Sequence, residues 1–446
     1  LLVSGAPSTA SNDDPLENIT LLSAYALANE GAPQIVIARY ELESADAQKA
    51  VARGRILPQV SLFGQWSDNK LRYSGGELAD LYGEQNYPGE RYGYEFRQPL
   101  FNMSSYREIE RQGALVRRFE KNLDQAEIEL FQAVTDAYLK ALVSDATLAQ
   151  VSVELDALKQ QLAEASALYD RSLLPLTQLL ETQSRTQSVE ADLIQAEAEA
   201  TVATEGLAQL IGTRRVTLTP LKDEITLPLT FSSVARVVEA AIANSPVISA
   251  AEASVAAAAA TIEREKGSWW PTIDLVFSHQ YSDVGFDNLS SPPRSSDSIQ
   301  LSINYPLIQG GSGRAQIRGA EADYYAAKYQ LEAVRRSIEA QARSSWVQFN
   351  ASTERVAAAR KAFETSAISI DAARKSVRAG TAKVTDVLMA LSQRTRSERD
   401  LTYAQYQSVV AWLDLELITG SAPAEVAPML SVALMENSAK AIGSVD

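Results

Sequence analysis

Few residues in this chain have the type and spacing that catalysis or metal binding requires. The 446 residues include one histidine, His279, and no cysteine, which excludes thiolate nucleophiles, disulfides, cysteine-ligated metals and histidine-rich metal sites. No set of nucleophile, base and acid is apparent around His279, which lies on an expected strand near a loop. The glycine-rich run from Gly310 to Arg314 lacks the GxxxxGK[ST] pattern of a phosphate loop. We therefore expect a protein that is not an enzyme and that holds neither a metal nor another cofactor.

Charge and hydropathy exclude further kinds of protein. The 56 acidic and 41 basic residues give a formal net charge of −15, which argues against nucleic acid as a partner, because such binding needs clustered Lys and Arg. The acidic balance indicates either a solvated exterior or an acidic surface or lumen that repels anions. The apolar fraction of 46% predicts a folded chain. The sequence contains no run of 18 apolar residues, so we expect no transmembrane helix.

Two features bear on export. The chain starts at Leu1 rather than Met, which favours an export signal that has already been removed. Because the chain has no cysteine, we expect no cysteine-linked lipid anchor.

An offset of 208 residues relates two parts of the chain. It maps Gly212 onto Gly420 and residues 176–180 onto 384–388. Each part also carries a seven-residue apolar series, which is typical of helices that pack as coiled coils. The two series are Leu148, Leu155, Leu162 and Tyr169, and Val356, Phe363, Ile370 and Val377. The sequence therefore predicts a duplicated unit built on long helices.

Each copy also changes its period from helical to two. Helical stretches at about 16–55 and 233–266 lead into pairs of strands, with polar loops expected at about 68–90 and 282–297. Strands of about ten residues with one apolar face are typical of a transmembrane β-barrel, although four strands packed on a soluble core give the same alternation. We expect the following apolar side chains to face lipid: Val60, Leu62, Trp66, Tyr92, Tyr94, Phe96, Ile273, Leu275, Phe277, Ile299, Leu301 and Ile303.

These signals predict a domain organisation. A flexible arm (1–14) precedes a first repeat (15–212), and a connector (213–232) leads to a second repeat (233–420) and a C-terminal tail (421–446). Each repeat begins with a helical segment. The β-hairpins are expected at 58–101 and 271–309, and the long helical hairpins at 104–212 and 313–420. Val216-Thr217-Leu218 favours a short strand in the connector, and the tail is expected to be a short helix or disordered.

Four membrane strands cannot close a barrel, because the smallest spanning barrels have eight and lipid does not tolerate open sheet edges. Several chains must therefore share one barrel, and three chains would supply twelve strands, enough for an aqueous lumen. The predicted fold class is mainly α with membrane β. If three chains share the barrel, the duplicated unit of helical hairpin and β-hairpin would form a trimer whose 12-stranded β-barrel continues into an α-helical coiled-coil tunnel.

The residues also resemble a known family. The stretch Gly-Thr-x-x-Val-x-Asp-Val-Leu-x-Ala from Gly380 to Ala390, the Pro306-Leu307 pair followed by Gly310-Gly311, and the duplicated plan resemble the TolC family of outer-membrane channel proteins over about residues 15–420. The resemblance implies a homotrimer in the outer membrane of a Gram-negative bacterium, surrounded by outer-membrane lipid, with a large periplasmic tunnel and an equatorial belt of smaller elements. It also implies two partners, a periplasmic adaptor (membrane fusion protein) and an inner-membrane transporter. The function implied is type I protein secretion, multidrug efflux or both.

The same resemblance implies two sites on the helical hairpins. Asp386 matches the first aspartate of the family's periplasmic aperture, whereas the second aspartate falls at Met389 and the link-forming arginine at Ala382. A ring of like charges from three chains would favour cation binding and opening. The residues assigned to the aperture are Asp386, Glu181, Gln178 and Lys383. The residues assigned to the adaptor-docking tips are Ser172, Leu173, Leu174, Ala379, Gly380 and Thr381.

Two other protein classes share part of this pattern. A flagellin-like filament protein, or another structural coiled-coil assembly, has long helices, few aromatic residues and no cysteine, but it does not explain two strand pairs or the internal repeat. A periplasmic coiled-coil adaptor usually carries one helical hairpin flanked by β-domains, whereas this chain predicts two hairpins and no β-domain composition.

Overall fold

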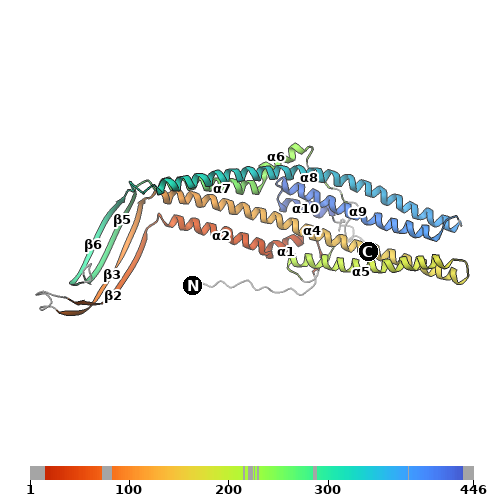
Figure 1. The fold of residues 1–446 in the computed structure, drawn as a ribbon, viewed down its shortest axis with the longest axis horizontal. Coiled ribbons are helices and arrows are strands. Elements are labelled where there is room, and N and C mark those ends of the chain that lie inside the picture. The colour runs from red at the N-terminus through yellow and green to blue at the C-terminus, as the bar shows by residue number, and fades with distance from the viewer. Residues whose placement is uncertain are drawn as a thin grey trace, which may run out of the picture. The chain divides into compact units, whose positions relative to one another are not determined.

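A computed structural model describes residues 16–72, 83–213, 216–218, 225, 227–228, 231–284, 289–379 and 381–434. The expected arm at 1–14, the tip residue Gly380 and the last part of the tail lie outside the described residues. The described chain is mainly helical and carries one four-stranded sheet (Figure 1). Contacts divide it into two compact units. The first unit gathers the residues up to Arg39, Asn122–Ile248 and the residues from Val334 onward, and the second gathers Tyr40–Lys121 and Ser249–Ala333.

The helices and strands follow the same order twice. The first series is β1 (Leu16–Ile19), α1 (Leu21–Gly31), α2 (Pro33–Gly54), β2 (Gln59–Arg72), β3 (Glu84–Phe101), α4 (Met103–Asp170) and α5 (Leu176–Ile211). The second series is β4 (Val216–Leu218), α6 (Val234–Asn244), α7 (Pro246–Gly267), β5 (Thr272–Val284), β6 (Ser290–Asn304), α8 (Ser312–Arg378) and α9 (Val384–Ile418), followed by α10 (Pro423–Leu434).

Proline divides the short helices at matching places. Pro33 opens α2 and Pro246 opens α7, each directly after a residue that ends the preceding helix. Proline suits the first position of a helix, where its missing N–H has no partner to lose. Among the described residues, no single helix is both long and apolar enough to cross a membrane, and one bent pair, α6 with α7, meets the criteria by length and composition only.

The first helical stretch begins later than its sequence pattern predicts. Residues from Leu16 to Ile19 form β1, which pairs in parallel with β4, instead of the first turns of a helix. Thr20 explains the boundary, because its hydroxyl accepts the backbone N–H of Ser23 at 3.2 Å and caps α1. The residue before a helix cap has extended backbone, so Ile19 is free to join a strand, and its carbonyl accepts the Tyr138 hydroxyl at 3.1 Å.

The sheet of the second unit has the strand order β2-β3-β5-β6, and all its neighbours are antiparallel. Its strands are longer than the apolar alternation predicts. The loops expected at 68–90 and 282–297 are wrong in extent, because β2 runs to Arg72, β3 begins at Glu84 and β6 begins at Ser290. The extra ladder is mostly polar, so backbone pairing continues beyond the residues that show apolar alternation.

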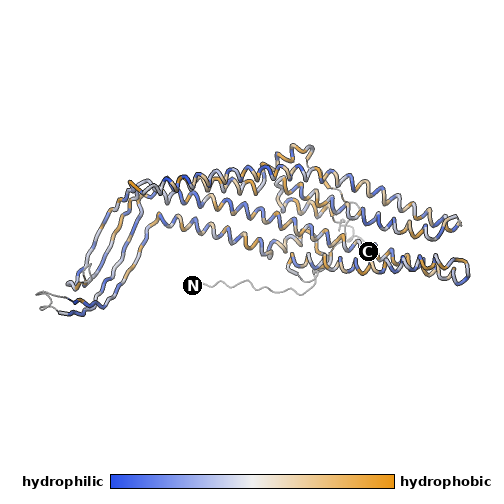
Figure 2. Tube along the Cα trace, viewed as in Figure 1, coloured by the Kyte–Doolittle hydropathy of each residue, from blue (hydrophilic) through white to orange (hydrophobic). Residues whose placement is uncertain are grey.

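Two antiparallel helical hairpins run through the first unit, although α4 up to Lys121 and α8 up to Ala333 belong to the second unit. The arms are α4 with α5 and α8 with α9, and Figure 2 shows apolar and polar residues interspersed along all four helices. One apolar core draws on all four helices, which means that the two hairpins pack against each other. Its buried members are Val151, Leu155, Leu158, Val189, Ala196, Ile370, Leu388 and Leu391.

Candidate functional site

The pairing register of the sheet places all twelve residues expected to face lipid on one face. Val60, Phe96 and Phe277 lie in a row that ends at Ile299, and the other members follow at steps of two residues along their strands. Several of these side chains are far more exposed than apolar residues of a soluble sheet, with Leu62 at 82%. An apolar face of this extent in a single chain needs a cover of lipid or protein.

The opposite face of the sheet is polar. Arg97 donates to Asp274 at 3.0 Å, and the hydroxyls of Ser278 and Ser298 lie 2.8 Å apart. Glu95 lies on the same face, opposite Ser61 in the pairing. The sheet therefore has one apolar and one polar face.

Aromatic side chains strengthen the apolar face and surround the only histidine. Tyr92 stacks on Tyr281 with ring centroids 4.8 Å apart, and Tyr94 stacks on His279 at 5.4 Å. The ring nitrogen Nδ1 of His279 lies 2.7 Å from a carboxylate oxygen of Asp297. No catalytic grouping surrounds His279 in the described part of the chain, and its partners suit a polar-aromatic residue at the rim of an apolar band.

Both outer strands of the described sheet have an unpaired side. β2 pairs only with β3, and β6 pairs only with β5, over 14 and 15 residues of strand. Edges of this length present rows of backbone donors and acceptors that favour pairing with another strand. Because the strands alternate in direction, β6 of one copy and β2 of another would meet antiparallel.

The turn between α4 and α5 has a defined geometry. Leu173 donates its backbone N–H to the Leu168 carbonyl at 2.9 Å, and Ser172 donates to Tyr169 at 2.7 Å, which is the Schellman pattern of helix ends. Ser172 has φ of 60° and is the one non-glycine residue with positive φ among those described. Leu173 is 68% exposed at the tip, and Leu174 is half-buried.

The turn between α8 and α9 repeats part of this pattern. Thr381 donates its backbone N–H to the Ser376 carbonyl at 3.0 Å, the same spacing as Leu173 to Leu168. The position that corresponds to Ser172 in this second turn is Gly380, which lies outside the described residues. Ala379 and Thr381 are exposed. The exposed tip residues thus lie at two turns with related backbone geometry, and Ser172 occupies the position that carries glycine in the second copy.

The residues assigned to the aperture lie in the first two turns of α5 and at the start of α9, where Lys383 is the N-cap. Asp386 is exposed, and its carboxylate accepts the backbone N–H of Lys383 at 2.9 Å, which caps α9. Lys383 and Glu181 are also exposed, while Gln178 is half-buried. In the part of the chain that the structure describes, no hydrogen bond or ion pair joins Glu181 to Asp386. The structure therefore brings Asp386 and Lys383 together within one turn.

A polar link between the two hairpins was missed by sequence reasoning. Arg185 of α5 donates to the Glu154 carboxylate of α4 at 2.7 Å and to the Ser392 hydroxyl of α9 at 2.6 Å. Glu154 is buried beside Leu155, in the series of residues that form the hairpin core. A charged residue next to a buried heptad position was the available signal, but its partner lies on another helix and has no fixed spacing from it.

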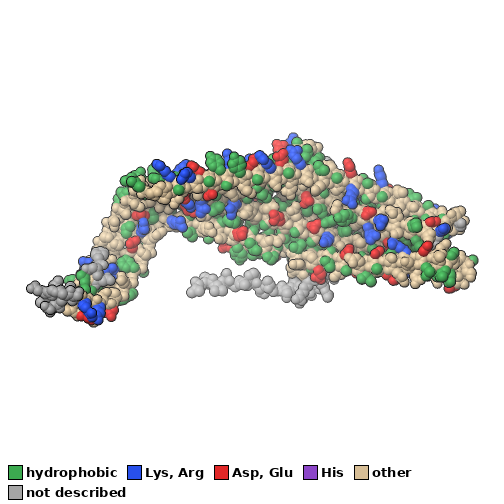
Figure 3. Space-filling model, in the orientation of Figure 1, with side chains coloured by type: hydrophobic (Ala, Val, Ile, Leu, Met, Phe, Trp, Pro, Cys, Tyr) green, Lys and Arg blue, Asp and Glu red, His purple; other side chains and the backbone are tan. Residues whose placement is uncertain are grey.

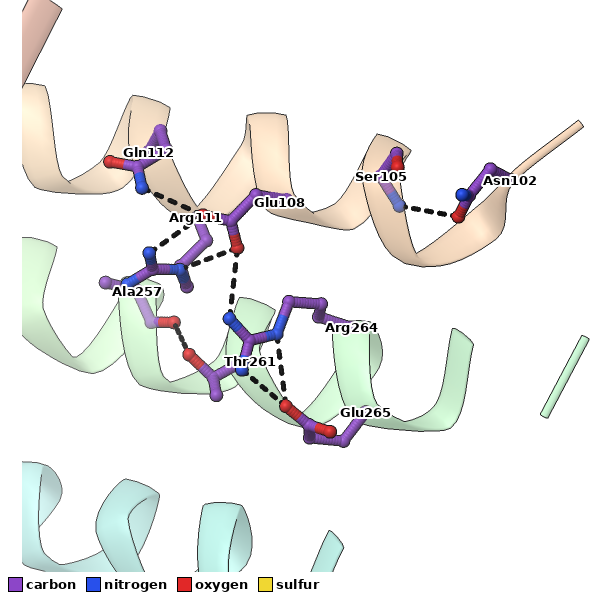
Figure 4. A network of polar contacts seen from close by, with 9 residues as sticks. All are labelled: Asn102, Ser105, Glu108, Arg111, Gln112, Ala257, Thr261, Arg264 and Glu265. Carbon is purple, nitrogen blue, oxygen red and sulfur yellow. Dashed lines mark hydrogen bonds and ion pairs between the residues drawn. The ribbon is translucent and has the colours of Figure 1, made fainter. Parts of the chain in front are cut away.

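A second buried network joins α4 to α7 within the second unit (Figure 4). The Glu108 carboxylate accepts hydrogen bonds from Arg111 at 2.8 and 2.9 Å, from Gln112 at 2.8 Å and from Arg264 at 3.2 Å. Arg264 also bonds Glu265 on its own helix. Burial alone would raise the pKa of Glu108, but the Arg111, Gln112 and Arg264 donors outweigh it and lower that pKa to about 2. The four charges neutralise one another, so the network holds the two helices together without a net buried charge.

One carboxyl group of α9 shows the opposite shift. Burial, assisted by the nearby charge of Asp136, raises the pKa of Asp414 above its usual range, although Gln132 of α4 donates a hydrogen bond to it at 3.0 Å. Tyr406 donates its hydroxyl to Asp136, so α4 and α9 are joined by two polar contacts near the end of α9. No group of three or more His, Cys, Asp or Glu residues in the described chain could hold a metal ion.

Comparison with known proteins decides the family. A family described as outer membrane efflux protein matches residues 24–213 and 237–421, one match for each predicted repeat. The chain belongs to this family. The expectations of a TolC-like, non-enzymatic outer-membrane protein are thereby confirmed, and neither the flagellin-like nor the adaptor interpretation is supported.

Individual relatives cover nearly the whole chain. It is 24% identical over 407 residues to the alkaline protease secretion protein AprF of Pseudomonas aeruginosa, covering 90% of this chain and 84% of the relative. It is 25% identical over 425 residues to the outer membrane protein TolC of Vibrio cholerae, covering 94% of each. The solved structure of the outer-membrane channel OprN superimposes with a TM-score of 0.76 at 21% identity, covering 94% of this chain and 96% of that one. This structural likeness confirms the mainly helical fold with its sheet.

Proposed function

We propose that the chain is the outer-membrane export duct of a three-component system in a Gram-negative bacterium. The observation that carries this proposal is the four-stranded sheet with one apolar face, one polar face and two open edges. A sheet of this kind is unstable alone in either solvent, because water does not favour its apolar face, and lipid cannot form hydrogen bonds with its polar face and open edges. The proposed duct passes proteins or small molecules from an inner-membrane transporter across the periplasm and the outer membrane.

The sheet is proposed to be one third of a barrel shared by three copies. β6 of each copy pairs with β2 of the next, which gives twelve antiparallel strands and leaves no edge exposed to lipid. Helices beside these edges support the same contact. α2 exposes Tyr40 and Val51, and α8 exposes Tyr325 and Tyr329, the last at 74%. Large exposed apolar side chains on the two flanking helices are suited to packing between neighbouring copies.

The helical hairpins are proposed to form the periplasmic tunnel and its aperture. Three copies would bring Asp386 and Glu181 into a ring at the tip, with Gln178 and Lys383 beside them. Since both carboxylates are exposed, the negative charge of the ring would attract cations, and the repulsion between the carboxylates would favour opening. Asp386 then has two roles, because its carboxylate also caps α9.

The turns at the ends of the hairpins are proposed to dock a periplasmic adaptor. This surface comprises Ser172, Leu173, Leu174, Ala379, Gly380 and Thr381. The exposed Leu173 supports the proposal, because a leucine at the tip of a turn is available for an apolar contact with a partner helix. AprF and the proteases secretion protein PrtF are secretion proteins by name, whereas BepC is an efflux protein by name. Proteins and small molecules therefore both remain within the proposed cargo.

The domain organisation is proposed to be two sequence repeats, 15–212 and 233–420, joined by the connector at 213–232. Both compact units contain residues from each repeat. Duplication and compact packing are thus separate levels of organisation, since corresponding segments of the two repeats pack side by side.

Single-channel recording tests this proposed function. Detergent-purified protein is added to a planar bilayer, and its mass in the same detergent is measured. The expected result is a trimer that inserts and gives stable pores, whose cation selectivity falls when Asp386→Ala and Glu181→Ala are combined. A monomer that stays in solution without detergent and never inserts would contradict the proposed function.

A further inference from the structure

The segment between β6 and α8 is strongly exposed and apolar. Ile308 is 92% exposed and Leu307 is 72% exposed, and Tyr305 before them is also exposed. The segment has neither helical nor strand structure, and Gly310 and Gly311, with φ of 58° and 85°, turn the chain into α8. Two adjacent branched apolar side chains with this exposure indicate a contact that the single chain does not provide.

This segment lies directly beyond the apolar band of the sheet. Ile303, the last lipid-facing residue of β6, pairs with Ile273 near the start of β5. From Ile273 to Tyr281, β5 extends about 27 Å along its own axis at roughly 3.4 Å per residue, and a barrel strand tilted by ~40° would thereby cover about 20 Å of the ~25 Å apolar band. Leu307 and Ile308 therefore follow the strand at the level where hydrocarbon gives way to lipid headgroups.

Two cations without partners follow on α8. Arg314 and Arg318 are exposed and are spaced four residues apart, so they share one face of the helix. Neither guanidinium has an ion pair or side-chain hydrogen bond within the residues that the structure describes, unlike Arg343 further along α8, which bonds Glu339 at 2.7 Å. Figure 3 shows Lys and Arg side chains, with Asp and Glu among them, over the helices α7 and α8 next to the sheet.

The other outer strand has a similar arrangement. Arg53 and Arg55 are exposed where α2 ends, and the exposed Leu57 follows them before β2 begins. Both edges of the sheet therefore combine exposed apolar side chains with arginine at the helical end of the strand. The chain has a net charge of −15, so a group of arginines at the helical ends of the outer strands indicates that an anionic partner binds there.

We propose that Leu307, Ile308, Arg314 and Arg318, which together form the linker surface, bind an anionic phospholipid. The acyl chains pack against Leu307 and Ile308, and the headgroup phosphate accepts hydrogen bonds from Arg314 and Arg318. Arginine suits this role because its planar guanidinium binds phosphate oxygens in pairs. The proposal rests on the proposed function, since it requires the sheet to lie in a membrane.

Lipid retention by the purified full-length protein tests the proposal. Wild type and the R314Q/R318Q variant are incubated in detergent with equal amounts of phosphatidylglycerol and phosphatidylcholine, and the lipid retained per chain is measured. Wild type should retain phosphatidylglycerol preferentially, and R314Q/R318Q should retain at least threefold less. Lys328→Gln is the matched control, because Lys328 is an exposed cation further along α8 with no ion pair to any described residue, and its replacement should leave retention unchanged. A second variant, L307S/I308S, should reduce retention of both lipids.

The outcomes separate this proposal from the proposed function. Equal retention of the two lipids by wild type, or full retention by R314Q/R318Q, would overturn the linker surface even if the protein still forms conducting pores. Loss of the trimer in R314Q/R318Q would also overturn it, by assigning the arginines to a contact with a second copy. A wild type that forms no pores would contradict the proposed function instead.

Discussion

The side-chain oxygens of Ser366 and Ser397, in the second hairpin, lie 2.7 Å apart. The corresponding positions of the first hairpin carry two apolar residues. An offset of 208 residues maps Leu158 onto Ser366 and Val189 onto Ser397, and all four side chains are buried. The duplicated hairpins therefore satisfy equivalent core positions in two ways, by apolar packing in one copy and by a hydrogen bond in the other. The Ser366 hydroxyl also donates to the Phe363 carbonyl.

Removing one hydroxyl of this pair should have a modest cost. Ser397→Ala should lower the free energy of unfolding by about 1 kcal/mol, because it removes one interhelical hydrogen bond while Ser366 keeps its backbone acceptor. Urea unfolding of the detergent-purified protein measures the change. Ser344→Ala, on an exposed part of α8, is the control. A loss above about 3 kcal/mol would contradict this explanation.

Replacement of Ser172 by glycine should not destabilise the protein. Its positive φ disfavours any residue with a Cβ by about 1 kcal/mol, so Ser172→Gly should leave stability unchanged or raise it slightly, and Ser172→Val should lower it by about 1–2 kcal/mol. Thermal unfolding of both variants provides the measurement. Arg171→Gly, one residue earlier and without positive φ, should be destabilising. If Ser172→Gly and Arg171→Gly behave alike, the left-handed turn is not the cause.

Loss of Arg185 should be severe, because it leaves the buried Glu154 without its cation. Arg185→Met should lower the free energy of unfolding by about 3 kcal/mol, and adding Glu154→Leu should restore most of that loss. The matched control is Lys159→Met, which removes an exposed pair with Glu190 at 3.7 Å and should cost less than about 1 kcal/mol. Equal losses from the two single variants would contradict a special role for Arg185.

The Glu108 network predicts how stability depends on pH. The pKa of Glu108 is about 2 in the folded state and about 4.3 in the unfolded state. The stabilisation is therefore fully present above the unfolded pKa and is lost as pH falls through the folded pKa. Glu108→Gln should therefore be less stable than wild type at pH 7, and the difference should shrink between about pH 4 and pH 2. Melting temperatures across this range test it. Glu110→Gln, which alters an exposed pair with Arg107, should show little pH dependence.

The sequence predicts those parts of the fold whose signals are local. Apolar alternation locates the halves of the strands that carry the apolar face, and Gly212 and Gly420 mark the ends of α5 and α9, where both adopt positive φ. β1 and the distal parts of β3 and β6 could not be found in this way. They are held by backbone pairing with distant segments, and backbone groups are the same in every residue.

The candidate sites show the same division. Asp386 can be assigned from a motif, but its role as a helix cap depends on the turn geometry that places it next to the Lys383 N–H. The Arg185 and Arg264 networks connect residues 31 and 156 positions apart along the chain, and no spacing rule joins such residues. The exposed Ile308 and the unpaired Arg314 become informative only when burial and partners are known.

The central claim is that copies of this chain join through β2 and β6 into a closed ring of three. Because the chain has no cysteine, Ser61→Cys on β2 and Ser298→Cys on β6 can be combined and cross-linked in membranes with a bis-maleimide that spans about four strand residues. Glu95→Cys with Ser278→Cys, on the paired central strands, is the control and should link only within one chain. For the β2–β6 pair we expect covalent dimers and trimers and nothing larger. Monomers alone, or a ladder extending past the trimer, would contradict the central claim.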